Sequence, residues 1–250
     1  MDPYFWQIPV LILVGAVAGV LNVLAGGGSL LTLPLLIFFG LPAATANGTN
    51  RVAIFCQNIF AIAGFKRQGI FPIRLALLCI PPALIGSYIG ANLAITVDEM
   101  VFRRLLALVM VGVLVFMIVD PLKHLQQAEK PITPARLALL VVSFFGIGIY
   151  GGFVQAGVGF LIITGLLVHG LDLVRINAVK VLVIFAFTVV ALGVFVVHGQ
   201  VDYVLGLALA VGNSAGGWFA SHLAVKKGHE WIKRFVIATV LIFALRLLLP

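Results

Sequence analysis

The chain has 250 residues, of which 62% are hydrophobic and 10% are charged, and its mean hydropathy is +1.21. A soluble domain of this length has no use for so much apolar surface, because single hydrophobic cores stop growing near this size. The net charge of +8 does not indicate a nucleic-acid partner, since the basic residues stand singly or in pairs between apolar runs. The composition therefore predicts a polytopic protein whose surroundings are a lipid bilayer.

Ten apolar segments follow one another along the chain, and most are close to the ~20 residues that cross the hydrocarbon of a bilayer. We expect all of them to be helices, so the predicted fold class is an all-α polytopic membrane protein. The second and the seventh segment are too short to cross the bilayer unaided. The segments are 8–24, 29–39, 43–65, 73–95 and 102–119 in the first half, and 136–155, 160–169, 173–197, 203–224 and 231–249 in the second.

Three adjacent glycines, Gly26, Gly27 and Gly28, interrupt the first long apolar run. Each costs roughly 1 kcal/mol in a helix interior relative to alanine, so we expect the backbone to unwind there. Lipid tolerates such a break only where protein or a watery cavity satisfies the freed backbone groups. A weaker copy in the second half ends with Gly157 and Gly159. Matching breaks in the two halves of a chain are typical of a transporter's binding site.

The two halves are related by a shift of 130 residues, under which Asn47 meets Asn177 and Ile54-Phe55 meets Ile184-Phe185. Agreement in segment lengths and glycine positions indicates an internal duplication. We predict a first membrane repeat over 1–120, a linker over 121–135 and a second repeat over 136–250. Because each repeat has an odd number of segments, the second must be inverted, with the broken and short segments near the midplane.

Positive charges set the expected orientation of the chain in the membrane. If the linker over 121–135 is cytoplasmic, eleven of the 16 Lys and Arg residues lie inside, as the positive-inside tendency requires. Both termini are then extracytoplasmic.

The eight acidic residues all lie at or beyond a segment end. A proton or metal-cation carrier usually needs a carboxylate at membrane depth, so a cation pump is disfavoured. No spacing in the sequence indicates a metal site, a cofactor, a nucleophile with its base or a phosphate loop. The sequence therefore does not predict an enzyme.

Two basic residues, Arg51 and Lys180, each lie about 7 residues, or ~10 Å, inside the third segment of their half. A charge at that depth costs several kcal/mol unless it is solvated or paired. Since no carboxylate is available, the expected counter-charge is a bound anion. Other groups expected around this anion are side chains and freed backbone N–H groups, namely those of Asn47, Thr49, Asn50, Asn177, Asn22, Gln155, Gly26, Gly27, Gly28, Gly157 and Gly159.

Each candidate also has a structural interpretation. The long side chains of Arg51 and Lys180 can reach the nearer membrane interface. The glycines can serve close helix packing alone, and Asn22 and Gln155 can cap freed backbone instead of touching a ligand. The histidines near segment ends are typical interfacial side chains.

Short glycine-containing motifs recur through the chain, namely Gly15-Ala16-Val17-Ala18-Gly19, Ala25-Gly26-Gly27-Gly28-Ser29 with Pro34, Gly40-Leu41-Pro42, Ala46-Asn47-Gly48-Thr49-Asn50, Gly151-Gly152-Phe153 and Gly157-Val158-Gly159. With these residues the chain resembles, over essentially its whole length, the TauE/SafE family of sulfite and organosulfonate exporters. Its second half departs from the first, with Val158 in the place of Gly28 and Thr164 in the place of Pro34. The resemblance implies a bacterial inner-membrane permease for small sulfur-containing anions such as sulfite or sulfoacetate.

The sequence thus predicts a secondary transporter that moves a small inorganic or organic anion by alternating access of its two halves. No cofactor is expected, and the sequence is compatible with a homo-oligomer. Two alternatives stay open at this point. One is an anion channel on the same scaffold, and the other is a membrane subunit that anchors a partner and transports nothing.

Overall fold

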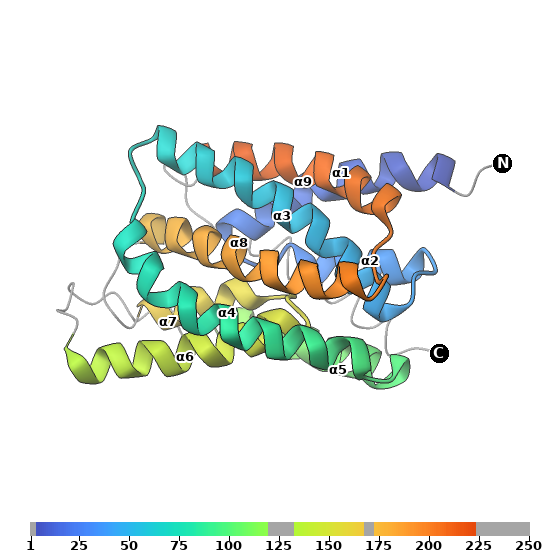
Figure 1. The fold of residues 1–250 in the computed structure, drawn as a ribbon. Coiled ribbons are helices and arrows are strands. Elements are labelled where there is room, and N and C mark those ends of the chain that lie inside the picture. Colours follow the sequence, from blue (N-terminus) through green and yellow to red (C-terminus); the bar gives the residue numbers. More distant parts are fainter. Residues whose placement is uncertain (1–3, 120–132, 168–172, 224–250) are drawn as a thin grey trace.

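The computed structural model describes residues 4–119, 133–167 and 173–223. Over these ranges the chain forms helices and no strands, as the composition predicts. The long helices run roughly along one common direction (Figure 1). The helices are α1 (Tyr4–Leu24), α2 (Ser29–Phe38), α3 (Ala43–Arg67), α4 (Ile73–Thr96), α5 (Glu99–Val119), α6 (Pro134–Phe153), α7 (Val158–Leu167), α8 (Leu173–Val197) and α9 (Tyr203–Leu223).

These helices agree with the first nine predicted segments to within a few residues at each end. The start of α6 has a local helix-capping feature that the apolar pattern did not reveal. There Thr133 accepts a hydrogen bond from the backbone N–H of Arg136, and Pro134 suits the first helical turn. The helix therefore begins at Pro134, inside the predicted linker. The tenth predicted segment, 231–249, and linker residues 121–132 lie outside the described residues.

Helix pairs from the two halves of the sequence build the bundle. In both cases the first long helix of one half packs on the fourth helix of the other half: α1 on α9, and α6 on α4. The third helices, α3 and α8, pack against each other between these pairs. Buried apolar side chains form two clusters, one mainly among α1, α2, α3, α8 and α9, and the other mainly among α4, α6, α7 and α8.

Glycines let the two helix pairs approach until their backbones touch. A Cβ atom on Gly216 of α9 would lie 2.0 Å from the carbonyl oxygen of Ala16 on α1. One on Gly148 of α6 would lie 2.4 Å from the carbonyl oxygen of Ala83 on α4. Small residues four apart are the usual means of such close packing in membranes. The spaced pairs are Gly15 and Gly19, Gly212 and Gly216, Gly86 and Gly90, and Gly148 and Gly152.

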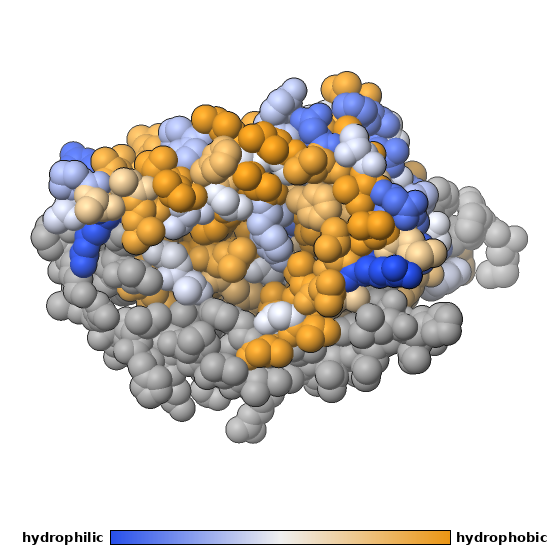
Figure 2. Space-filling view, turned by 90° about the horizontal axis from the view of Figure 1, so that it is seen from below, coloured by the Kyte–Doolittle hydropathy of each residue, from blue (hydrophilic) through white to orange (hydrophobic). Residues whose placement is uncertain are grey.

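The described exterior is suited to lipid. Large apolar side chains on the lipid-exposed faces include Ile85 of α4, which is 60% exposed, and Val142 of α6, which is 68% exposed. Figure 2 shows hydrophobic residues over the middle of one face, with the most hydrophilic residues gathered toward its two ends. Five described helices, α1, α4, α6, α8 and α9, are long and apolar enough to cross a membrane by length and composition. The ten-residue helices α2 and α7 extend only about 15 Å.

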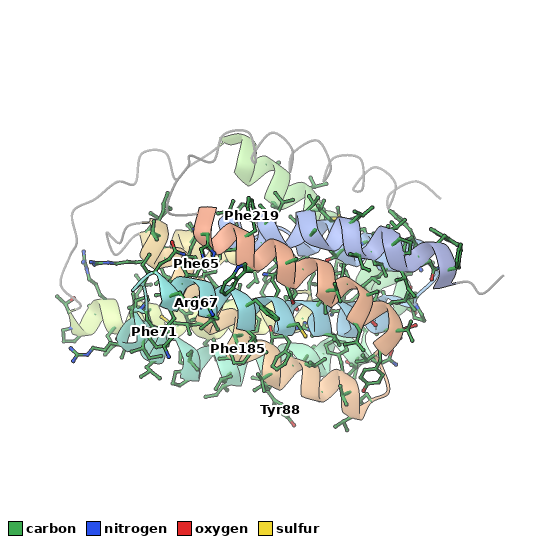
Figure 3. The ribbon with its side chains drawn as sticks, turned by 90° about the horizontal axis from the view of Figure 1, so that it is seen from above. Phe65, Arg67, Phe71, Tyr88, Phe185 and Phe219 are labelled. Carbon is green, nitrogen blue, oxygen red and sulfur yellow. The ribbon has the colours of Figure 1, made fainter. Side chains whose placement is uncertain are left out.

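One end of the bundle combines basic and aromatic side chains (Figure 3). The Lys66 ammonium lies 5.8 Å from the ring centre of Phe71, and the Arg67 guanidinium lies 4.9 Å from the ring centre of Trp218. Cations and amphipathic rings are enriched together where helices leave the hydrocarbon. The end of α3 therefore has the composition of a membrane interface.

The glycine contacts predict that two nearby substitutions in α6 have different effects on the stability of the protein. Gly148→Ala is expected to lower the stability of the protein by about 1–3 kcal/mol, because the added methyl group overpacks the α4–α6 contact. Gly146→Ala is the matched control, since a Cβ atom there meets nothing within 4 Å and alanine favours a helix over glycine. Thermal unfolding of the detergent-purified variants measures the difference. Equal melting temperatures for the two variants would contradict the close packing.

Candidate functional site

The two helix breaks lie against each other in the interior of the protein. The first covers 25–28, between α1 and α2, and the second covers 154–157, between α6 and α7. A Cβ atom on Gly26 would lie 2.4 Å from Cα of Gly159, and one on Gly159 would lie 2.2 Å from Cα of Gly26. The backbones of the two halves are thus in direct contact here. The glycines therefore serve close packing as well as the change in chain direction.

The second break differs in its extent from the predicted glycine stretch. Gly151 and Gly152 belong to the last turn of α6, and Gly159 is helical in the first turn of α7. Gln155 reverses the chain with φ = 63°, where the first break uses Gly26 with φ = 81°. A left-handed conformation is uncommon for a residue with a side chain. The second break therefore uses Gln155 together with Gly157, which has φ = 73°. The glycine pattern revealed Gly157 but not the glutamine.

Arg51 and Asn47, one turn apart on α3, cap the carboxyl end of α6. Nη2 of Arg51 donates to the carbonyl oxygens of Gly151, at 3.0 Å, and of Gly152. Nδ2 of Asn47 donates to the carbonyl oxygen of Phe153 at 2.6 Å. The last four carbonyls of a helix have no partner within it, and they carry the negative end of the helix dipole. The fourth, that of Tyr150, accepts from the backbone N–H of Val154 and Gln155, so all four are satisfied.

Lys180 makes the corresponding contact at the carboxyl end of α1, and Asn177 accepts a second hydrogen bond from it. Nζ of Lys180 donates to the carbonyl oxygen of Val23 at 2.7 Å and to Oδ1 of Asn177 at 2.6 Å. Lys180 follows Arg51 by 129 residues, and Gly152 follows Val23 by the same number. Since α3 and α1 belong to the first half and α8 and α6 to the second, each half supplies the cation that caps the broken helix of the other.

Both cations are buried, so the interpretation that they reach a membrane interface is wrong. Arg51 is 0% exposed and Lys180 is 1% exposed. Within the described ranges neither has a carboxylate at ion-pair distance, whereas the surface residue Arg103 pairs with Glu99 at 2.7 Å. The guanidinium of Arg51 also lies 5.0 Å from the ring centre of Phe195. Its Nε and Nη1 atoms have no hydrogen-bond partner among the described residues.

Thr49 and Asn50 hold neighbouring elements and do not join these contacts. Oγ1 of Thr49 accepts from the backbone N–H of Asp202 at 2.8 Å, ahead of α9. Oδ1 of Asn50 accepts from Oγ1 of Thr32 at 2.6 Å, and its Nδ2 donates to Oγ of Ser29 at 3.2 Å. These bonds tie the start of α2 to α3. The structure thus brings Arg51 together with Asn47, and Lys180 with Asn177, but hydrogen-bonds neither pair to Thr49 or Asn50.

The side chains of Asn22 and Gln155, beside the two breaks, hydrogen-bond to backbone and to other polar side chains. Oδ1 of Asn22 accepts from the backbone N–H of Gly28 at 3.1 Å, so Asn22 does cap freed backbone. Its Nδ2 donates to Oε1 of Gln57 at 3.1 Å, and Nδ2 of Asn213 donates to the same oxygen at 3.2 Å. Nε2 of Gln155 donates to Oγ1 of Thr188 at 2.9 Å. The sequence reasoning overlooked Gln57 and Asn213, although an amide inside an apolar segment was the available signal.

A pocket of about 220 Å³ lies beside the second break. The hydroxyl of Tyr150 at its edge donates to the carbonyl oxygen of Ala156. The walls are mostly apolar, and they include neither Arg51 nor Lys180. The pocket is lined by Val109, Gly112, Val113, Tyr150, Gly157, Phe160 and Leu161.

Comparison with known proteins gives a match over nearly the whole chain. Residues 11–247 match the family model described as sulfite exporter TauE/SafE. A probable membrane transporter protein of Sinorhizobium is 26% identical over 99% of this chain and 94% of its own length. A probable membrane transporter protein of Haemophilus influenzae is 24% identical over 95% and 92%. The probable membrane transporter protein YfcA of Escherichia coli K12 is 26% identical over 96% and 88%. No solved structure matches the chain.

The contact between the two breaks predicts that Gly159→Ala is severely destabilising. The methyl group would enter the backbone of Gly26, which cannot move aside as a flexible side chain would. Gly165→Ala in the same helix is the matched control, because its nearest neighbour is a side-chain atom of Ile147 at 3.8 Å. We expect a lower yield of monodisperse protein and a lower melting temperature for Gly159→Ala alone. If the two variants behave alike, the breaks do not touch.

Proposed function

Because the chain belongs to the TauE/SafE sulfite exporter family, we propose that this membrane transporter is a secondary transporter of small oxyanions. Its membership makes it a multi-pass transporter, in agreement with its relatives named as probable membrane transporter proteins. The substrate class, sulfite or an organosulfonate such as sulfoacetate, is our proposal, and so are the bacterial inner membrane and extracytoplasmic termini. The family's description and the positive charge of the candidate site support the proposed substrate class.

The single observation that carries the proposal is the unused hydrogen-bonding capacity of Arg51. A guanidinium has five N–H groups, and those on Nε and Nη1 have no partner among the described residues. A buried donor left unpaired costs about 1–3 kcal/mol, and more when it is charged. A small oxyanion offers several acceptor oxygens together with the missing negative charge. Such an anion would accept hydrogen bonds from the unpaired N–H groups of Arg51 and would also balance its positive charge.

Inverted halves that rock about the two breaks are the proposed means of transport. Two pairs of corresponding helices have equal lengths, 10 residues for α2 and α7 and 25 for α3 and α8. The corresponding rings of Phe55 and Phe185 stack on each other with centroids 5.3 Å apart, as residues beside a two-fold axis would. The reciprocal caps made by Arg51 and Lys180 follow the same relation. These observations support an inversion in which each half carries one cation to the centre.

Arg51→Lys tests the role of the spare N–H groups. Lysine keeps the positive charge and the contact with the carboxyl end of α6, so the variant is expected to fold. It loses the donors on Nε and Nη1, each a charged hydrogen bond of about 1.5–3 kcal/mol to a bound anion. We expect KM for radiolabelled sulfite in proteoliposomes to rise about tenfold or more.

The matched control is Arg103→Lys, the same substitution at an exposed arginine, for which we expect unchanged transport. An unchanged KM for Arg51→Lys would remove Arg51 from the anion site. Exchange of labelled against unlabelled sulfite separates the alternatives, since a transporter shows it and an anchoring subunit does not. Unitary currents without such exchange would indicate a channel.

A further inference from the structure

The carboxyl ends of broken membrane helices are natural cation sites. Their free carbonyl oxygens carry the negative end of the helix dipole, and in transporters built from broken helices such ends coordinate the coupling cation. This chain has two such ends in its interior, at Val23 of α1 and at Gly151-Gly152 of α6. A side-chain cation already occupies each of them. The place that an inorganic cation would take is therefore filled by the protein itself.

The charges at the centre do not cancel. At the two breaks, the carboxyl ends of α1 and α6 contribute roughly half a negative charge each, and the amino ends of α2 and α7 contribute roughly half a positive charge each. Arg51 and Lys180 add one positive charge each. The helix ends therefore roughly cancel, and since the described ranges place no carboxylate at ion-pair distance from either cation, a surplus of positive charge is left over. The surplus lies on the side of Arg51, whose Nε and Nη1 are unpaired. Lys180, by contrast, donates to two oxygens, those of Val23 and Asn177.

We propose that Arg51 and Lys180 are resident counter-cations that replace an inorganic coupling cation at both helix ends and leave a surplus of positive charge for a small oxyanion. That the remaining charge binds an anion rests on the proposed function. That the two side chains take the place of a cation rests on their contacts with the helix ends alone. Transport then needs neither Na⁺ nor K⁺. Shortening either side chain creates a vacant cation site at the carboxyl end of the opposite half's helix. Lys180 is a positioning residue, because it acts through the helix end that it holds. Arg51 holds a helix end with Nη2 and has Nε and Nη1 left for the anion.

Lys180→Ala tests the vacant site directly. The substitution removes three methylene groups and the ammonium, and propylammonium has the same atoms. We expect the purified variant, in a buffer with N-methylglucamine as its only cation, to melt several degrees below the wild type. Propylammonium is expected to restore the melting temperature in a saturable manner, because it binds the folded state. The uncharged 1-propanol has the same shape and is expected to have no such effect.

The matched control for this experiment is Lys66→Ala, the same substitution at an exposed lysine, for which propylammonium is expected to do nothing. Equal effects of propylammonium and 1-propanol on Lys180→Ala would overturn the proposal, since a filled void and not a charge would then be restored. Should Lys180→Ala fail to fold, Lys180→Arg and Lys180→Met are compared. Arginine is expected to keep the wild-type melting temperature and methionine to lower it, and equal stability would overturn the proposal.

Transport provides the second readout. Sulfite flux by the wild type is expected to be the same in Na⁺, K⁺ and N-methylglucamine buffers, and flux by Lys180→Ala is expected to require propylammonium. Wild-type flux that vanishes without Na⁺ or K⁺ would overturn the proposal. If the wild type moves no sulfite in any buffer, the proposed function fails instead. The melting temperatures then still decide whether the two side chains replace a cation.

Discussion

A helix that ends inside an apolar interior leaves four backbone carbonyls that must find donors, and this requirement governs the centre of the protein. Both α1 and α6 end there, at Leu24 and Phe153. Side chains from the opposite half donate to several of these carbonyls, and backbone N–H groups of the breaks donate to others. Each interrupted helix is consequently complete only when the other half is in place. The two halves depend on each other for hydrogen bonding as well as for packing.

Close glycine packing makes these contacts geometrically possible. The pairs α1–α9 and α4–α6 approach until backbone meets backbone, and the two breaks meet at Gly26 and Gly159. This leaves the third helices, α3 and α8, between the pairs, where their side chains reach the ends of α6 and α1. The polar residues of α3 follow from this position, because the helix faces helix ends and amides on several sides. Its polar side chains Asn47, Asn50 and Arg51 are buried, so they contact other parts of the protein.

The same arrangement connects structure to transport. A hydrogen bond between a side chain of one half and a carbonyl of the other must change whenever the halves move, so the caps lie where a rocking motion would act. In the proposed mechanism, the spare N–H groups of Arg51 bind the anion beside a contact that opens when the halves move. The proposal therefore links binding and movement through one side chain, Arg51. The chain belongs to a family of membrane transporters, and such a linkage would serve transport. The substrate itself is our proposal.

Local physics made much of this protein predictable from its sequence. Apolar runs gave the helices, the cost of adjacent glycines gave the first break, and the absence of acidic residues from the apolar segments singled out Arg51 and Lys180. The partners of those two cations were decided only by the tertiary structure, because they are main-chain carbonyls at Gly151, Gly152 and Val23. Every residue has a carbonyl group, so no sequence pattern marks the ones that lack a partner. Which helix ends would meet which cation depended on how closely the glycine faces allowed the helices to pack.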